Sequence, residues 1–112
     1  MKELYVWRKK IETGSLAGKT AFVTGAAQGL GAAIAKAMHA VGARVVLTDV
    51  NEAVEKTASE MEGVGAETVL TAGLDVRDID AFEKVFASFV ERTGGIDIVA
   101  NNAAVTVILG GV

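Results

Sequence analysis

Three glycines in the segment TGAAQGLG (24–31) have a spacing that could bind a phosphate group through the backbone. They are Gly25, Gly29 and Gly31, and they lie between a short apolar run and an amphipathic helical pattern. Backbone N–H groups at the amino end of a helix hold a diphosphate, because the helix dipole favours an anion there. Side chains at the closest positions would block that approach. The alternative is a glycine-rich turn without a ligand, and this motif alone does not decide between the two.

An acidic residue follows the glycine segment at the distance that a dinucleotide site requires. Asp49 ends the next apolar run, eighteen positions after Gly31. A carboxylate there can accept hydrogen bonds from the hydroxyl groups of an adenosine ribose, and it repels a 2′-phosphate. No arginine occurs in the glycine segment or directly after Asp49 to attract such a phosphate. The sequence therefore favours NAD over NADP, and the alternative is that Asp49 is a turn residue at a strand end.

Two later segments complete a pattern that resembles a known family. GLDV (73–76) and ANNAA (100–104) follow the glycine segment in order, within residues 16–104. The three segments resemble the TGxxxGxG, Asp-Val and Asn-Asn-Ala-Gly motifs of the short-chain dehydrogenase/reductase (SDR) family. Three residues separate the first two glycines, unlike the GxGxxG of other dinucleotide-binding folds. The chain thus resembles the N-terminal, Rossmann-type portion of that family.

The resemblance implies cofactor-binding roles for residues in all three segments and for Asp49. The glycine segment would hold the pyrophosphate, and Asp49 would contact the adenosine ribose. Asp75 and Val76 would border the adenine ring. Asn102 and Ala103 would lie beside the ribose on the nicotinamide side. The full set that the resemblance implies is Gly25, Gln28, Gly29, Leu30, Gly31, Asp49, Asp75, Val76, Asn102 and Ala103.

Two other residues of ANNAA have separate implications. By the resemblance, Asn101 would brace the sheet against the turn that follows the first strand. Ala104 departs from the family pattern, since it replaces the final glycine, and its methyl group could crowd the cofactor. Without the glycine segment, turn capping would be the first interpretation of Asp75 and of both asparagines.

Tyr5 and Lys9 have the spacing of the family's catalytic Tyr-x-x-x-Lys pair. On a helix this spacing places both residues on one face, where a lysine lowers the tyrosine pKa and helps it pass a proton to a carbonyl. In the family the pair follows a fifth strand, whereas here it precedes the first apolar run. We therefore expect an N-terminal extension without chemistry, and we assign no catalytic residue and no metal ligand.

Apolar runs alternate with helical patterns along the chain. The strand-like runs are 20–24, 44–49, 67–73 and 96–100, and helical patterns follow the first three, the last two of them over 51–62 and 79–92. This alternation predicts an α/β fold with a parallel sheet covered on both faces. The resemblance implies the N-terminal half of a doubly wound Rossmann-type sheet, about four strands in the order 3-2-1-4. We expect residues 1–17 to form an extension, helical around Leu4–Ile11, and residues 18–112 a partial dinucleotide-binding domain.

The helical patterns also predict which side chains face inward and where two helices begin. Asn51 and Asp78 are the expected N-caps of the second and third helices. Phenylalanines of the third pattern are expected in the core rather than in a ligand site. The predicted stripes comprise Leu30, Ile34, Met38 and Val41 in the first helix, Val54, Ala58 and Met61 in the second, and Phe82, Val85, Phe86, Phe89 and Val90 in the third.

Composition excludes several other classes of function. Hydrophobic residues make up 51% and charged residues 22% of 112 residues, which indicates a soluble globular protein. The net charge of −3 gives no reason to expect nucleic acid or an anionic membrane as a partner. Absence of cysteine excludes disulfides and thiolate chemistry, and the single histidine argues against zinc. No run reaches the roughly 20 apolar residues of a membrane helix, and we expect a cytoplasmic location.

Two functions are consistent with these observations. The first is the cofactor-binding part of an NAD-dependent oxidoreductase acting on a carbonyl/alcohol pair. By the resemblance, the catalytic Ser, Tyr and Lys would lie beyond Val112, so that this chain alone would be inactive. It would be a truncated reading frame or a piece completed by another chain, and a small-molecule substrate would bind only in the completed enzyme. The alternative is a non-catalytic nucleotide-binding or self-associating module. Ile96, Ile98 and Val99 form a strand edge that could recruit a second copy or another chain.

Overall fold

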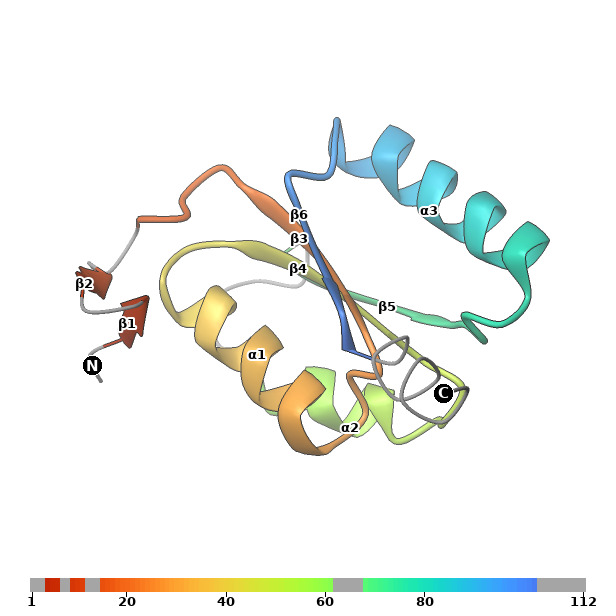
Figure 1. Cartoon of the computed structure of the whole chain (residues 1–112), viewed down its shortest axis with the longest axis horizontal. Helices are drawn as coiled ribbons and strands as arrows, with labels where there is room; N and C mark the ends of the chain where they lie inside the picture. The colour runs from red at the N-terminus through yellow and green to blue at the C-terminus, as the bar shows by residue number, and fades with distance from the viewer. Residues whose placement is uncertain (1–3, 7–8, 12–14, 62–67, 103–112) are drawn as a thin grey trace, which may run out of the picture.

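Four parallel strands form the main sheet of the protein. The computed structural model describes residues 4–6, 9–11, 15–61 and 68–102. The strands are β3 (Thr20–Thr24), β4 (Arg44–Asp49), β5 (Val69–Gly73) and β6 (Ile98–Asn101). They lie in the order β5-β4-β3-β6 (Figure 1). Numbered along the chain within this sheet, that order is 3-2-1-4, so the predicted fold class and strand order are confirmed.

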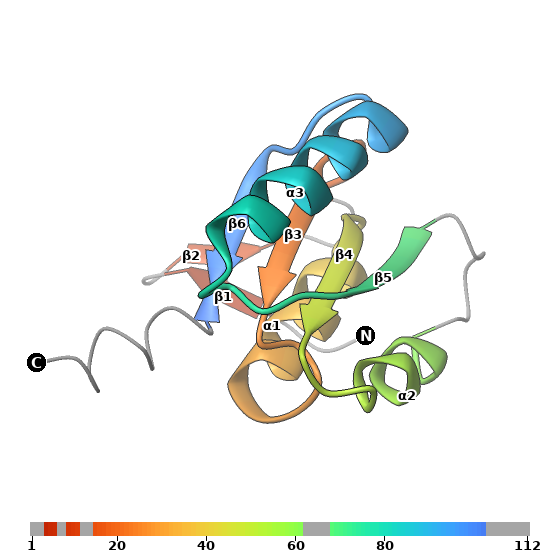
Figure 2. The same cartoon turned by 90° about the vertical axis from the view of Figure 1, so that its right-hand side faces the viewer.

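Helices cover both faces of this sheet. The helices are α1 (Gly29–Ala40), α2 (Val54–Ser59) and α3 (Ile79–Thr93). Figures 1 and 2 show α1 and α2 on one face and α3 on the other. Alternate residues of each strand feed these two layers, since successive side chains of a strand point to opposite faces. In β3, Ala21 and Val23 belong to the α1/α2 core, whereas Phe22 belongs to the α3 core.

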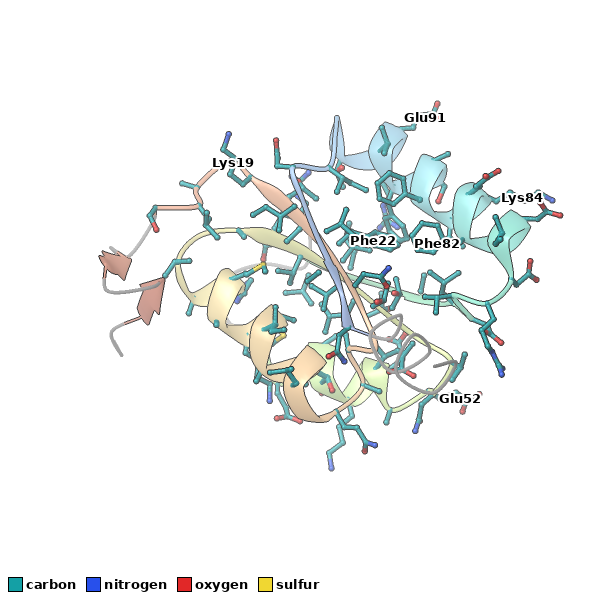
Figure 3. All side chains as sticks on the ribbon, in the orientation of Figure 1. Lys19, Phe22, Glu52, Phe82, Lys84 and Glu91 are labelled. Atoms are coloured by element: carbon teal, nitrogen blue, oxygen red, sulfur yellow. The ribbon has the colours of Figure 1, made fainter. Side chains whose placement is uncertain are left out.

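Phenylalanine side chains make the core beneath α3. Phe22 is fully buried and meets the rings of Phe82, Phe86 and Phe89 edge-on, at centroid distances of 5.9, 5.1 and 6.3 Å. Figure 3 shows Phe22 and Phe82 side by side between the sheet and α3. Each such pair contributes about 0.5–1.5 kcal/mol beyond the burial of apolar area. The interpretation of these residues as core is therefore confirmed. Val90 is an exception to the predicted stripe, because 37% of it is exposed.

The buried face of α1 differs from the predicted stripe of large residues. Leu30 is 67% exposed, and Ile34 and Met38 are only partly buried. The residues that α1 buries are Gly31, Ala32 and Ala35. Small side chains let the helix backbone approach the sheet closely, so the inward face is turned toward them rather than toward Leu30. Placing Leu30 in an inward stripe was therefore wrong.

The ends of α2 and α3 are set by local hydrogen bonds. Asp78 caps α3 as predicted, accepting a hydrogen bond from the Ala81 N–H at 3.1 Å. The α2 prediction was too long, because the helix begins at Val54 and its N-cap is Ala53. Asn51 instead accepts from the Ala53 N–H at 2.8 Å, in the turn that precedes the helix. This local side-chain hydrogen bond competes with helical backbone hydrogen bonds, so the helix begins at a later residue than predicted.

A short antiparallel ladder near the N-terminus replaces the helix expected around Leu4–Ile11. Strand β1 (Leu4–Val6) pairs with β2 (Lys9–Ile11), so the helical prediction was wrong. An isolated helix of this length is marginal in water, and aromatic and β-branched residues favour extended backbone. Tyr5 and Lys9 lie on different strands and are paired with Lys10 and Val6 respectively. They therefore do not share the helix face that a catalytic pair would need.

Candidate nucleotide-binding site

The predicted site residues gather where the parallel strands end. The glycine segment follows β3, Asp49 is the last residue of β4, and Asp75 follows β5 by two residues. Asn101 ends β6. Because the strands are parallel, their carboxyl ends meet at one edge of the sheet, and the chain reverses its winding direction between β3 and β6. Ligands of open α/β sheets bind at such a switch point.

Backbone geometry explains the glycines of the segment. Gly25 and Gly29 have φ angles of +63° and +61°, a left-handed region that favours glycine. Gly31 lies within α1 directly above the turn. A Cβ atom added at Gly31 would overlap the carbonyl oxygen of Gly25 and lie 3.1 Å from Nδ2 of Asn102. A positive φ thus accounts for Gly25 and Gly29, and the close approach of the turn to the helix accounts for Gly31.

Asp49 holds the glycine turn in place. Its Oδ2 accepts a hydrogen bond from the Ala27 N–H at 3.0 Å, and its Oδ1 accepts from the Asn51 N–H at 2.9 Å. A carboxylate oxygen can accept two hydrogen bonds, so each oxygen retains acceptor capacity. The same side chain can therefore fix the turn and still accept from a diol in front of it.

A second brace comes from α2, and sequence reasoning missed it. The Thr57 hydroxyl, which is buried, donates to the Ala27 carbonyl oxygen at 2.8 Å. Ala26 is also tied to β4, since its N–H donates to the Thr48 carbonyl at 3.0 Å. Nothing in the local sequence distinguishes Thr57 from a solvated helix residue. Its role arises only because α2 packs beside the turn.

The two asparagines at the end of β6 bind the glycine turn from the other side. Thr24 and Asn101 are register partners, and the Thr24 hydroxyl donates to Oδ1 of Asn101 at 2.9 Å. The predicted bracing role of Asn101 is therefore confirmed. Asn102 is also directed at the turn, because its Nδ2 lies 3.4 Å from the Gly25 carbonyl oxygen. Ala103 and Ala104 lie outside the described residues.

A pocket of about 220 Å³ opens beside the turn. Four of the residues predicted from sequence line it together, namely Gly25, Asp49, Asp75 and Val76. Sequence reasoning did not assign the other three lining residues, which are Val50, Leu74 and Arg77. Val50 is apolar and 68% exposed. Arg77 brings a cation into a pocket for which no arginine was expected.

The residues that line that pocket do not include Gln28, Gly29 or Leu30. Gln28 and Gly29 line a separate groove of about 460 Å³ between α1 and α2, together with Lys36 and Lys56. Leu30 is exposed at the amino end of α1. Among the described residues, no cluster of three or more potential metal-ligating side chains occurs. In the same part of the chain, no helix is long and apolar enough to cross a membrane.

An ion pair dominates the electrostatics of the pocket. Arg77 holds the pKa of Asp75 at about 2, mainly by side-chain hydrogen bonding and by its backbone N–H. Because the folded pKa lies below the unfolded one, the pair stabilises the fold above about pH 4 and is lost as the pH falls toward 2. We expect an NMR titration of the Asp75 carboxyl carbon to give a pKa near 2. Arg77→Ala should raise this pKa part of the way toward the ordinary range, because the backbone N–H of residue 77 still donates to Oδ1. An ordinary pKa in the unsubstituted protein would contradict this geometry.

Comparison with known proteins agrees with this arrangement. The family description "short chain dehydrogenase" matches residues 19–110. The short chain dehydrogenase/reductase dpmpG of Macrophomina phaseolina is 42% identical over 95 residues, which are 84% of this chain and 54% of that protein. The oxidoreductase UcpA of Salmonella typhimurium is 41% identical over 92 residues, covering 82% of this chain and 35% of that protein.

Solved structures give the same result. A dehydrogenase/reductase from Sinorhizobium meliloti is 46% identical with a TM-score of 0.71, over 78% of this chain and 35% of that one. Carveol dehydrogenase from Mycobacterium avium, solved in complex with NAD, is 32% identical with a TM-score of 0.73, over 80% and 37%. The chain thus spans from about a third to about half of the length of these relatives. Because the family match covers residues 19–110 and agrees with the glycine turn and the strand order, the chain belongs to the short-chain dehydrogenase/reductase family of oxidoreductases.

Proposed function

We propose that this chain is the NAD-binding part of an oxidoreductase that acts on a carbonyl/alcohol pair. The observation that carries the proposal is the convergence of the glycine turn, Asp49 and the Asp75–Val76 pair on one pocket. The diphosphate would lie at the amino end of α1, where backbone N–H groups and the helix dipole favour an anion. The adenosine ribose would lie against Asp49, and the base would enter the pocket.

The choice of NAD over NADP rests on Asp49. Its carboxylate would accept hydrogen bonds from the 2′- and 3′-hydroxyl groups, whereas a 2′-phosphate would meet like charge. The complex of carveol dehydrogenase with NAD supports the choice by similarity. Arg77 carries the only opposite charge among the residues that line the pocket, and Asp75 already neutralises it at 2.8 Å.

Hydride transfer would need residues beyond this chain. Among the described residues, Tyr5 and Lys9 are on separate strands that precede β3, so they do not form the family's helical pair. We therefore propose that this chain alone binds NAD without catalysing turnover. The substrate would be bound and converted only in an enzyme that also supplies the Ser, Tyr and Lys of the family. A carbonyl compound would be reduced there by NADH, and an alcohol would be oxidised by NAD.

Ligand-dependent unfolding tests this proposal. NAD at a hundred times its dissociation constant should stabilise the folded chain by about 2.7 kcal/mol, with a smaller effect of NADP at the same concentration. Calorimetric titration would give both dissociation constants, and nicotinamide mononucleotide, which lacks the adenosine part, serves as the matched control. A folded chain whose melting temperature does not respond to NAD would overturn the proposal.

A second function, self-association, is favoured by the edge at β6. Among the described strands β6 ends the sheet, and Val99 is 50% exposed on it. A second copy paired antiparallel about Val99 would place Ile98 opposite Ala100 and Asp97 opposite Asn101, with no like charges facing. We expect a dimer in light scattering, converted to a monomer by Val99→Lys. A monomer at all concentrations would exclude this function.

A further inference from the structure

Asp75 and Arg77 form a two-pronged ion pair in the wall of the pocket. Oδ1 of Asp75 accepts from the Arg77 backbone N–H and from Nε, both at 3.0 Å. Oδ2 of Asp75 accepts from Nη2 at 2.8 Å. This side-on arrangement matches the planar guanidinium to the planar carboxylate and fixes the orientation of both.

The ion pair occupies most of the hydrogen-bond acceptor positions of the Asp75 carboxylate. Each carboxylate oxygen can accept two hydrogen bonds. Within the described part of the chain, Arg77 occupies both positions on Oδ1 and one position on Oδ2. Asp75 therefore has one directed acceptor left, on Oδ2. Its low pKa, about 2, keeps this oxygen an acceptor at neutral pH.

The surroundings identify what would meet that acceptor. Val50, Leu74 and Val76 supply apolar walls, and Asp49 lines the same pocket. If Asp49 binds the ribose diol, as the proposed function requires, the attached base enters between these walls. A purine with a 6-amino group would present a donor to Oδ2, whereas a 6-oxo group would present a second acceptor and repel it.

We propose that Arg77 is a positioning residue that makes the pocket select adenine over 6-oxopurines. By holding Asp75 through Nε and Nη2, it points the remaining acceptor of Oδ2 at the 6-position of the base. Without the Arg77 side chain only the backbone N–H of residue 77 would hold the carboxylate, through Oδ1, and part of the binding energy would be used to orient Oδ2. This inference rests on the proposed NAD site but concerns recognition of the base alone.

Titration with NAD and with nicotinamide hypoxanthine dinucleotide tests the proposal on the full chain. The bases of these two ligands differ at the 6-position, which is amino in adenine and oxo in hypoxanthine, and at N1, which is an acceptor in adenine and carries a hydrogen in hypoxanthine. We expect the unsubstituted chain to prefer NAD by about tenfold, as the loss of one hydrogen bond to a charged acceptor implies. Arg77→Ala and Arg77→Lys should reduce the preference to about threefold or less, since lysine lacks the planar fork. Asp75→Asn should abolish the preference.

Arg92→Ala is the matched control, because Arg92 lies on α3 against the ring of Phe89 and does not line the pocket. Melting temperatures measured in parallel with the titrations show whether a substitution destabilises the fold. A purely structural role would weaken the binding of both ligands equally and leave the ratio of their affinities unchanged. An unchanged ratio in Arg77→Ala would overturn the proposal while leaving the NAD site intact. A preference for the hypoxanthine ligand in the unsubstituted chain would overturn it too, because Arg77 would then donate to the base itself. Absence of NAD binding would overturn the proposed function and this inference together.

Discussion

Gly31→Ala should destabilise the fold and weaken NAD binding at least tenfold, although alanine is the better helix former. Gly31 lies inside α1, where alanine would gain about 0.5–1 kcal/mol from helix propensity. Its new methyl group would, however, overlap the Gly25 carbonyl oxygen, which is backbone and cannot rotate away. Overpacking of this kind costs about 1–3 kcal/mol or more. We expect a net loss of stability in thermal or urea unfolding and at least a tenfold loss of NAD affinity in calorimetry, since the turn must shift.

Gly73→Ala is the matched control for this substitution. It makes the same chemical change on β5, but an added Cβ at Gly73 would meet no atom within 4 Å. We expect unchanged or slightly higher stability there. The double variant Gly31→Ala/Asn102→Ala adds a sharper test, because it removes the amide 3.1 Å from the new methyl group and leaves the carbonyl in place. Rescue by Asn102→Ala would contradict the assignment of the clash to Gly25.

Asp49→Asn should weaken NAD binding by about 10–100-fold and narrow the preference for NAD over NADP. A hydrogen bond to a charged group contributes about 1.5–3 kcal/mol, and 1.4 kcal/mol corresponds to a tenfold change in affinity. The amide also has only one oxygen for the two backbone N–H groups that Asp49 now satisfies, those of Ala27 and Asn51. One of them would face an NH₂ group, so we expect the glycine turn to lose stability as well.

Glu52→Gln provides the control for the charge change. It removes one negative charge three positions further along, on an exposed residue that does not line the pocket. Parallel titrations of both variants with NAD and NADP would separate a local contact from a general change in net charge. If Asp49→Asn kept the ratio of the two affinities, Asp49 would be a bracing residue of the turn and not the selector of the cofactor.

The sequence by itself determined the fold class, the strand order through the family motifs, and the identity of most pocket residues. It did so because the alternation of apolar runs and helical patterns constrains parallel strands to one connection geometry. Parallel strands then bring their carboxyl ends to one edge, so that Gly25, Asp49, Asp75 and Val76 had to converge. Each of these residues occupies a fixed place at the end of a strand, which local patterns can locate.

Only the tertiary structure decided which side chains support that site. The Thr57 hydroxyl donates to the carbonyl oxygen of Ala27, which is 30 positions away in the sequence. The Arg77 guanidinium is held in the wall of the pocket by its ion pair with Asp75. The rotation of α1, which buries Gly31 and Ala35 and exposes Leu30, follows from how closely the helix backbone approaches the sheet. These features depend on packing distances between elements and on which hydrogen-bond partners meet there. The periodicity of apolar residues indicates which face of a helix or strand is buried. It does not indicate which element packs against that face, at what distance, or with which hydrogen-bond partners.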